Sequence, residues 1–294
     1  MHEADQWSRW LIETRFGGDA EHAAKSMEWL FAVRNKVLDH AQLREGDVLL
    51  DVGAGDGLIA FGALDRVGPT GHVIFSDISQ PLLDHTQALT ERMALRDRCT
   101  FVRASAEELR PIPDQVVDVV TTRSVLIYVA DKAQALCEFY RVLKLGGRLS
   151  LFEPINRDWR GEDDQIAPDL GPIAELVRRV SSFYKQLQPS TDPMLDFDER
   201  DLLRHCEAAG FNEMHLELIV NIQAAEPTKW EVMVHAPPNP TVPSLGEAMT
   251  QLFTPEEATE FERYMRPFVE EGRGKEWSAL AYVWATKGVE QRIR

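Results

Sequence analysis

The chain has 294 residues, and its 32 Lys and Arg against 48 Asp and Glu leave a formal net charge of −16. Apolar residues make up 44% and charged residues 27%, which is ordinary for a globular protein with a sizeable core and excludes disordered and fibrous classes. The acidic balance argues against a nucleic acid as the main partner, because its phosphates would be repelled.

Other simple features exclude further classes. No apolar run approaches the roughly 20 residues that a membrane helix requires, and the acidic start of the chain lacks the apolar stretch of a secretory signal. Cys99, Cys137 and Cys206 lie far apart, so we expect free thiols in a reducing compartment and therefore a cytoplasmic protein. No pair among the eight histidines has metal-ligand spacing, so no metal is expected.

The first half of the chain alternates predicted helices and strands. Two helices are expected over 3–16 and 20–41, separated by two glycines. Beyond them the predicted strands are 48–52, 73–76, 99–103, 117–122 and 147–153, and the predicted helices are 57–67, 80–96 and 130–143. Several of these strands are continuous apolar runs, which is typical of parallel strands buried on both faces.

The composition changes after about residue 155. Eleven of the sixteen prolines lie between 168 and 267. The predicted helices in this part are 168–187, 198–209, 244–252 and 255–271, and the predicted strands are 214–222 and 277–284. Tryptophan is absent from residues 30–158, so the large rings belong to the segments that flank the central sheet.

A glycine loop, Asp51-Val-Gly53-Ala-Gly55-Asp-Gly57, follows the first strand and opens a helix. Glycines let the backbone turn sharply and approach a ligand near helix N-terminal N–H groups. A dinucleotide site requires G-x-G-x-x-G, but Leu58 stands at the last of these positions, which disfavours a nicotinamide oxidoreductase. A tight turn without a ligand is the alternative interpretation of this loop taken alone.

The loop resembles motif I of the class I S-adenosylmethionine-dependent methyltransferases. Four further segments match that family in the same order, namely Asp77-Ile78, 101–109, 117–129 and 141–149. The resemblance is close over 25–155 and looser over 198–222. It implies an α/β fold with a Rossmann-like, seven-stranded, mostly parallel sheet, helices on both faces and helical cap or lid insertions. It also implies S-adenosylmethionine as methyl donor and S-adenosylhomocysteine as product.

The resemblance assigns cofactor-binding residues by position. These are Asp51, Gly53, Ala54, Gly55, Gly57, Asp77, Ile78, Ser105, Ala106, Glu107, Arg123 and Ser124. A carboxylate at the end of a strand can accept hydrogen bonds from both hydroxyl groups of a ribose. The resemblance implies this role for Asp77 and implies that Ile78 packs against adenine. The alternative for Asp77 is that it caps the N-terminus of the following helix. Ser105 stands where the family usually has aspartate, so the adenine contact is expected from the backbone or from Glu107.

The segments outside the shared sheet are expected to hold the methyl acceptor. The expected organisation is an N-terminal helical lid (1–41), the cofactor-binding core (42–155), a helical insertion (156–197), the remainder of the sheet domain (198–222 and 276–288) and a substrate cap (223–275). The tryptophans of the segments outside the shared sheet suit an apolar or planar acceptor. The alternative is that these segments serve ordinary packing or form a dimer interface.

Methyl transfer is an in-line displacement that requires a positioned nucleophile and, for some acceptors, a base. The catalytic candidates are Glu153, as the base, and Tyr128. The substrate-binding candidates are Trp7, Trp10, Arg123, Asn156 and Arg157, and His235 is a weaker one. A structural carboxylate at Glu153 and an ion pair at Arg123 are the alternatives.

These observations predict a methyltransferase that acts on an O, N or C nucleophile of a small molecule. A catalytically silent S-adenosylmethionine-binding sensor or partner subunit is the alternative. We expect neither a nucleic acid nor a membrane as partner, and a homodimer is left open.

Overall fold

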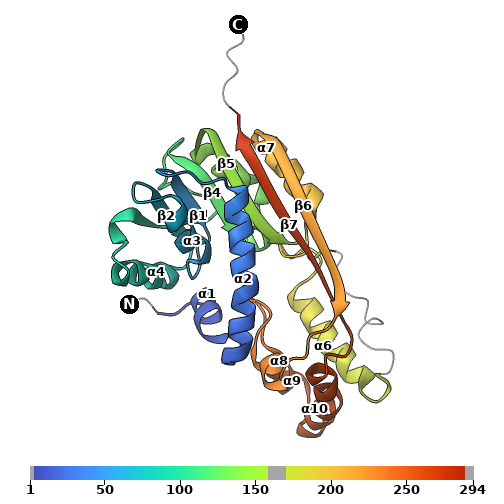
Figure 1. The fold of residues 1–294 in the computed structure, drawn as a ribbon. Helices are drawn as coiled ribbons and strands as arrows, with labels where there is room; N and C mark the ends of the chain where they lie inside the picture. Colours follow the sequence, from blue (N-terminus) through green and yellow to red (C-terminus); the bar gives the residue numbers. More distant parts are fainter. Residues whose placement is uncertain (1–2, 158–169, 289–294) are drawn as a thin grey trace.

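The structure is a computed structural model that describes residues 3–157 and 170–288. Its centre is a seven-stranded sheet of order β3-β2-β1-β4-β5-β7-β6 (Figure 1). The strands are β1 (Val48–Val52), β2 (His72–Asp77), β3 (Cys99–Arg103), β4 (Val117–Arg123), β5 (Leu143–Pro154), β6 (Phe211–Ala224) and β7 (Lys275–Lys287). The first five strands pair in parallel, and β7 is antiparallel to both β5 and β6. The predicted Rossmann-like, mostly parallel sheet is therefore confirmed.

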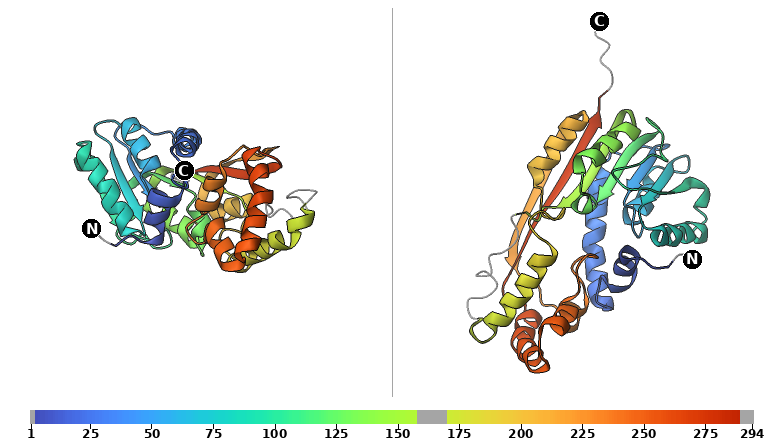
Figure 2. Two further views of the ribbon diagram at one scale, coloured as in Figure 1. Left: turned by 90° about the horizontal axis from the view of Figure 1, so that it is seen from below. Right: turned by 180° about the vertical axis from the view of Figure 1, so that it is seen from behind.

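Helices cover both faces of this sheet (Figure 2). The helices are α1 (Gln6–Arg9), α2 (Ala20–His40), α3 (Leu58–Arg66), α4 (Gln80–Arg92), α5 (Lys132–Val142), α6 (Ala174–Leu187), α7 (Glu199–Ala209), α8 (Trp230–His235), α9 (Leu245–Leu252) and α10 (Pro255–Glu270). Helices α2 and α3 pack on one face, and α5 and α7 pack on the other. None of the helices in the described ranges is long and apolar enough to cross a bilayer.

The continuous apolar strands follow from this double cover. Leu49 of β1 belongs to the core beneath α2 and α3, while its neighbour Leu50 belongs to the core beneath α5, and both are fully buried. Successive side chains of a strand point to opposite faces. A strand with a core on each side therefore needs an apolar residue at nearly every position.

The N-terminal segment differs from the single helix predicted over 3–16. Helix α1 is only one turn long, and a π-helical turn, η1 (Trp10–Thr14), follows it. The backbone N–H of Arg15 donates to the carbonyl of Trp10 at 2.8 Å, which closes the wide turn. Such turns are rare overall, but many of those that occur lie at functional sites. This one places the Arg15 guanidinium 5.3 Å from the ring of Trp10.

Strands β6 and β7 are longer than the predicted strands 214–222 and 277–284. They pair from Phe211 with Lys287 to Ala224 with Lys275, and β6 is an edge strand. Helices α8, α9 and α10 follow the far end of this ribbon, beside α6 (Figure 1). They share a small core of their own that includes Trp230 and Phe261. Residues 158–169, where the predicted helix over 168–187 begins, lie outside the described residues.

Two contacts attach this cap to the N-terminal segment. The indole Nε1 of Trp10 donates to the carbonyl of Pro237 at 3.0 Å. The ammonium of Lys229 lies 2.7 Å from the carboxylate of Asp19, at the start of α2. The N-terminal segment therefore lies between the cap and the sheet.

Candidate active site

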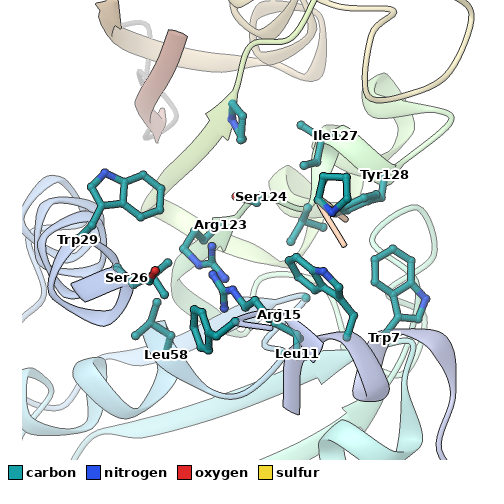
Figure 3. Close-up of a pocket in the computed structure, with 18 of the residues that line it drawn as sticks. Trp7, Leu11, Arg15, Ser26, Trp29, Leu58, Arg123, Ser124, Ile127 and Tyr128 are labelled. Atoms are coloured by element: carbon teal, nitrogen blue, oxygen red, sulfur yellow. The ribbon is translucent and has the colours of Figure 1, made fainter. Parts of the chain in front are cut away.

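A cavity of about 1230 Å³ lies between the sheet, the N-terminal segment, α2 and the cap (Figure 3). It extends along the carboxyl ends of the parallel strands, at the point between β1 and β4 where the strand order reverses direction. Open α/β sheets bind ligands at this switch point. The predicted residues that line the cavity are Trp7, Trp10, Asp51, Gly53, Ala54, Gly55, Asp77, Ile78, Ser105, Ala106, Glu107, Arg123, Ser124, Tyr128 and Asn156.

The glycine loop has the shape that its sequence predicts. Gly53 has a φ of +65°, and a Cβ atom there would lie 2.4 Å from Cγ2 of Val125. Gly57 does not line the cavity but is the N-cap of α3 with a φ of +86°. These conformations and close contacts exclude side chains, so the loop turns tightly and exposes backbone to the cavity.

Asp77 fixes this loop to the end of β2. One carboxylate oxygen accepts the N–H of Gly55 and the other accepts the N–H of Ser79, both at 2.8 Å. Each oxygen of an ionised carboxylate accepts more than one hydrogen bond, so both keep capacity for a ligand's hydroxyl groups. The N-cap of α4 is Ser79, so Asp77 is not the N-cap of this helix. Burial raises the pKa of Asp77.

Beyond Asp77, the edge of the cavity is formed by the apolar Ile78 and the polar Ser105 and Glu107. Ile78 is 45% exposed and lines the cavity, which gives a ligand an aliphatic surface beside the carboxylate. The Ser105 hydroxyl lies 3.3 Å from the Glu107 carboxylate, which also accepts the N–H of Asp131 at 2.8 Å. Glu107 thereby holds this edge in place.

Asp51 is bonded within the protein. Its carboxylate accepts the hydroxyl of Thr121 at 2.9 Å and the N–H of Ala60 at 3.2 Å. It joins β1 to β4 and to α3, and burial raises its pKa to about 7.

Glu153 does not have the surroundings of the general base that the sequence suggested. It is fully buried and does not line the cavity. Its carboxylate accepts the N–H groups of Val125, Leu126 and Ile127 at 3.0, 3.0 and 3.2 Å, and the hydroxyl of Thr122 at 3.3 Å. Those N–H groups begin the 3₁₀ turn η3 (Leu126–Tyr128), a typical anion-binding arrangement. This placement favours the structural alternative and corrects the assignment of Glu153 as a base.

Two other predicted residues lie outside the cavity. Arg157 makes ion pairs with Asp198 and Asp201, both at 2.9 Å, so its charge is compensated at the start of α7 instead of facing a substrate. His235 is bonded to the carbonyl of Glu231 at 2.7 Å. Neither side chain reaches the cavity lining.

Tyr128 and Trp7 both line the cavity and are in contact with each other. Their ring centroids lie 4.8 Å apart in an edge-to-face arrangement. Burial raises the pKa of the Tyr128 hydroxyl, so the phenol stays protonated at neutral pH. A protonated phenol can donate a hydrogen bond but cannot accept a proton as a base.

Further lining residues from the N-terminal segment and α2 were not singled out from the sequence. They are Leu11, Arg15, Phe16, Asp19, Glu21, His22, Lys25, Ser26, Glu28, Trp29 and Leu30, of which Figure 3 labels Leu11, Arg15, Ser26 and Trp29. His22, Ser26 and Trp29 follow the i, i+4, i+7 spacing of one helix face. That spacing was readable, but nothing in the sequence shows which face of α2 turns to the cavity.

The sheet order, the glycine loop and the Asp77 carboxylate define a class I S-adenosylmethionine-dependent methyltransferase. The residues fit the cofactor, because a backbone cradle without Cβ atoms lies beside a carboxylate with acceptor capacity for two hydroxyls. The chain belongs to the ubiE/COQ5 methyltransferase family, whose model matches residues 25–217. It is thus an enzyme that transfers a methyl group from S-adenosylmethionine to a small molecule.

Known relatives support this assignment. The chain is 32% identical over 181 residues to the ubiquinone/menaquinone biosynthesis C-methyltransferase UbiE of Vibrio vulnificus, covering 59% of this chain and 67% of that protein. It is 30% identical over 185 residues to the protein of the same name from Cronobacter sakazakii, covering 60% and 71%.

Solved structures show the fold alone. YcgJ of Bacillus subtilis has a TM-score of 0.56 at 17% identity, over 87% of this chain and 98% of that one. The [4+2]-cyclase SpnF has a TM-score of 0.53 at 19% identity, over 88% and 81%. A cyclase in this fold illustrates that reaction chemistry has to be argued from the site.

We expect Asp77→Ala to weaken S-adenosylhomocysteine binding by about 10- to 150-fold, because hydrogen bonds to a charged group are lost. Titration calorimetry measures the affinity, and a melting curve checks the fold. Asp65→Ala, at an exposed position of α3, is the matched control and should bind as the parent does. Equal affinity of Asp77→Ala and the parent would contradict the placement of the ribose.

Glu153→Gln should change how stability depends on pH. Burial raises the pKa of Glu153 to about 7, whereas the pKa of a Glu in the unfolded chain is about 4.3. Between these values the folded protein binds a proton that the unfolded chain has released, so this group lowers the free energy of unfolding as pH rises. The Gln variant cannot titrate there, so its free energy of unfolding should rise relative to the parent's from about pH 5 to about pH 8.

Denaturant unfolding at several pH values measures this difference. Glu260→Gln, at an exposed position of α10, is the control and should follow the parent. Parallel pH profiles for the parent and Glu153→Gln would show that Glu153 has no raised pKa.

Proposed function

We propose that this enzyme methylates a carbon atom of a planar aromatic acceptor bound beside the ends of β4 and β5. The observation that carries this proposal is the aromatic character of that side of the cavity. Its rings are Trp29, which lies beside Phe152 of β5, and Tyr128, which follows β4 and contacts Trp7; Trp10 and Phe16 also line the cavity. Rings of this kind bind flat, apolar molecules by stacking and edge-to-face contact. The names of the relatives, which specify C-methylation in ubiquinone and menaquinone biosynthesis, support carbon as the acceptor atom.

The cofactor and the acceptor bind at different strands of the sheet. On one side, Asp77 accepts the ribose hydroxyls, Ile78 packs on adenine, and Ser105 to Glu107 form the adenine edge. When bound, S-adenosylmethionine supplies an activated methyl group on a sulfonium. On the other side, the aromatic residues hold the acceptor ring in line with that group.

His22 takes the role of proton acceptor that the sequence analysis gave to Glu153. It lies in the first turn of α2 and lines the cavity, as Ser26 does one turn later, and imidazole is the side chain that enzymes use most often as a general base. Tyr128 is a positioning residue whose protonated hydroxyl orients the acceptor. The N-terminal segment excludes water, since Leu11 Cδ1 would lie 3.1 Å from a Cβ atom at Gly55 and thus covers the glycine loop.

The enzyme acts on a free small molecule in the cytoplasm under this proposal. The net charge of −16 opposes nucleic-acid acceptors. Cys99, Cys137 and Cys206 are all free thiols, in keeping with a reducing compartment. A homodimer stays a prediction.

Methyl-tritiated S-adenosylmethionine with dihydroxynaphthalene as acceptor tests the proposal. We expect label in a product whose methyl group resists ether cleavage, and one S-adenosylhomocysteine for each methyl transferred. Trp29→Ala should raise KM for the acceptor by about 3- to 10-fold, the value of a lost aromatic contact, and leave S-adenosylhomocysteine affinity unchanged.

Trp277→Ala is the matched control, because Trp277 is 46% exposed and lies outside the cavity lining. Label released by ether cleavage would contradict carbon as the acceptor atom. An unchanged KM in Trp29→Ala would contradict the acceptor side proposed here. Cofactor binding without any transfer would favour the silent sensor.

A further inference from the structure

Strand β6 forms one edge of the sheet (Figure 1). It spans 14 residues, and no strand within residues 3–157 and 170–288 pairs with its outer side. The N–H and carbonyl groups along such an edge can pair with another strand, so proteins usually protect the edge with charges, prolines, bulges or a short length. A long edge without this protection is a surface on which a further strand can dock.

The backbone groups on the outer side of β6 belong to alternate residues. The carbonyl of Ala279 in β7 accepts the N–H of Ile155 at 2.9 Å, on the β5 side of β7. Backbone groups of successive residues in an antiparallel strand point to opposite sides, so those of Leu280 point to β6, where Leu280 pairs with Ile219. The N–H and carbonyl of the next residue of β6, Val220, therefore point outward.

The far part of β6, residues 218–224, lacks the usual protection of an edge. Leu218, Val220 and Ile222, whose backbone groups all point outward, have side chains that are 39%, 50% and 52% exposed. This part of the strand contains no charged residue, proline or glycine. The near end differs, because a register shift there places the charged Glu213 in a left-handed conformation. The open edge is thus confined to the far part of the strand.

Within the residues that the structure describes, the end of the β6–β7 ribbon also has no third strand. β7 pairs with β5 only as far as Leu280 opposite Pro154, whereas β6 and β7 continue to Ala224 opposite Lys275. A two-stranded ribbon is marginally stable on its own, and a further strand stabilises it. Gln223 of this ribbon lines the cavity, and the cap follows the ribbon in the chain.

We infer that β6 pairs antiparallel with β6 of a second copy of this chain, across a two-fold axis at Val220. This register places Leu218 opposite Ile222 and Val220 opposite its own counterpart, so the exposed apolar side chains meet. It places Glu217 opposite Gln223, so no like charges face each other. Two copies that each carry a net charge of −16 repel, and an uncharged strip is where they can meet. The inference does not depend on the proposed function.

Sedimentation velocity of the full chain, from about 1 to about 200 µM, tests the inference, because a strand-pairing interface is small and a dissociation constant in the micromolar range is expected. Val220→Lys and Val220→Glu should each weaken dimerisation by at least about 10-fold, since the axis sets two like charges opposite each other. An equimolar mixture of the two variants should dimerise again, because the opposed charges are then unlike.

Two further variants are the controls. Val220→Thr keeps a β-branched side chain without a charge and should dimerise as the parent does. Met93→Lys introduces the same charge at a 55% exposed apolar residue after α4 and should also leave dimerisation unchanged. Melting curves and S-adenosylhomocysteine affinity check that every variant is folded.

Hydrogen exchange of the parent locates the interface without any substitution. The outward N–H groups of Val220 and Ile222 should exchange more slowly at about 200 µM than at about 1 µM, because pairing protects them. A parent that stays monomeric over this range would overturn the inference. So would a dimer with no added protection in β6, a dimer that folded Val220→Lys leaves intact, or a mixture of the two charged variants that does not dimerise.

Discussion

The buried carboxylate of Glu153 determines the geometry of the loop on which the cavity depends. Three consecutive N–H groups and one hydroxyl converge on it, and an anion is favoured at the start of a helical turn. The bend before that turn requires a left-handed Ser124, with a φ of +54°. This strain is sustained because Ser124 also donates its N–H to the carbonyl of Phe152 at 2.8 Å. The bend places Val125 against Gly53 and turns Tyr128 toward Trp7.

The same loop lies between the two sides of the cavity. On the β2 side, the Gly55–Asp77 hydrogen bond holds the glycine loop at the carboxyl end of the sheet. On the β5 side, the cavity is closed by elements from outside the shared sheet, namely the N-terminal segment, α2 and the cap. The sheet thus carries the motifs shared with the family, and under the proposed function the flanking segments supply the side chains that distinguish acceptors.

Local spacing was sufficient to predict the glycine loop and the position of Asp77 at the carboxyl ends of the strands. The glycine loop and Asp77 each follow an apolar strand, and parallel strands bring their carboxyl ends to one edge. The sheet and both of its helical layers could therefore be predicted from the chain. The extra length of β6 and β7 at their far ends could not, because the added pairs, Gln223 with Glu276 and Ala224 with Lys275, carry no apolar pattern.

The acceptor side could not be predicted in the same way. The role of Glu153 depends on donors from residues 122–127, and the role of Arg157 depends on acids more than 40 residues away. Arg157 was correctly placed after the fifth strand, whereas Glu153 lies within β5, and the partners of both side chains come from other elements. Arg15 was missed because the π-helical turn that directs it has no signal in the sequence. Its approach to Asp56 of the glycine loop, at 3.9 Å, is visible only in three dimensions.

The most direct test of the account is an experimental structure of the protein with bound S-adenosylhomocysteine. The account predicts both ribose hydroxyls within hydrogen-bond distance of the Asp77 carboxylate, with adenine against Ile78 and the sulfur facing the space between Trp29 and Tyr128. A cofactor bound with its ribose away from Asp77, or with its sulfur directed away from the aromatic side of the cavity, would contradict it.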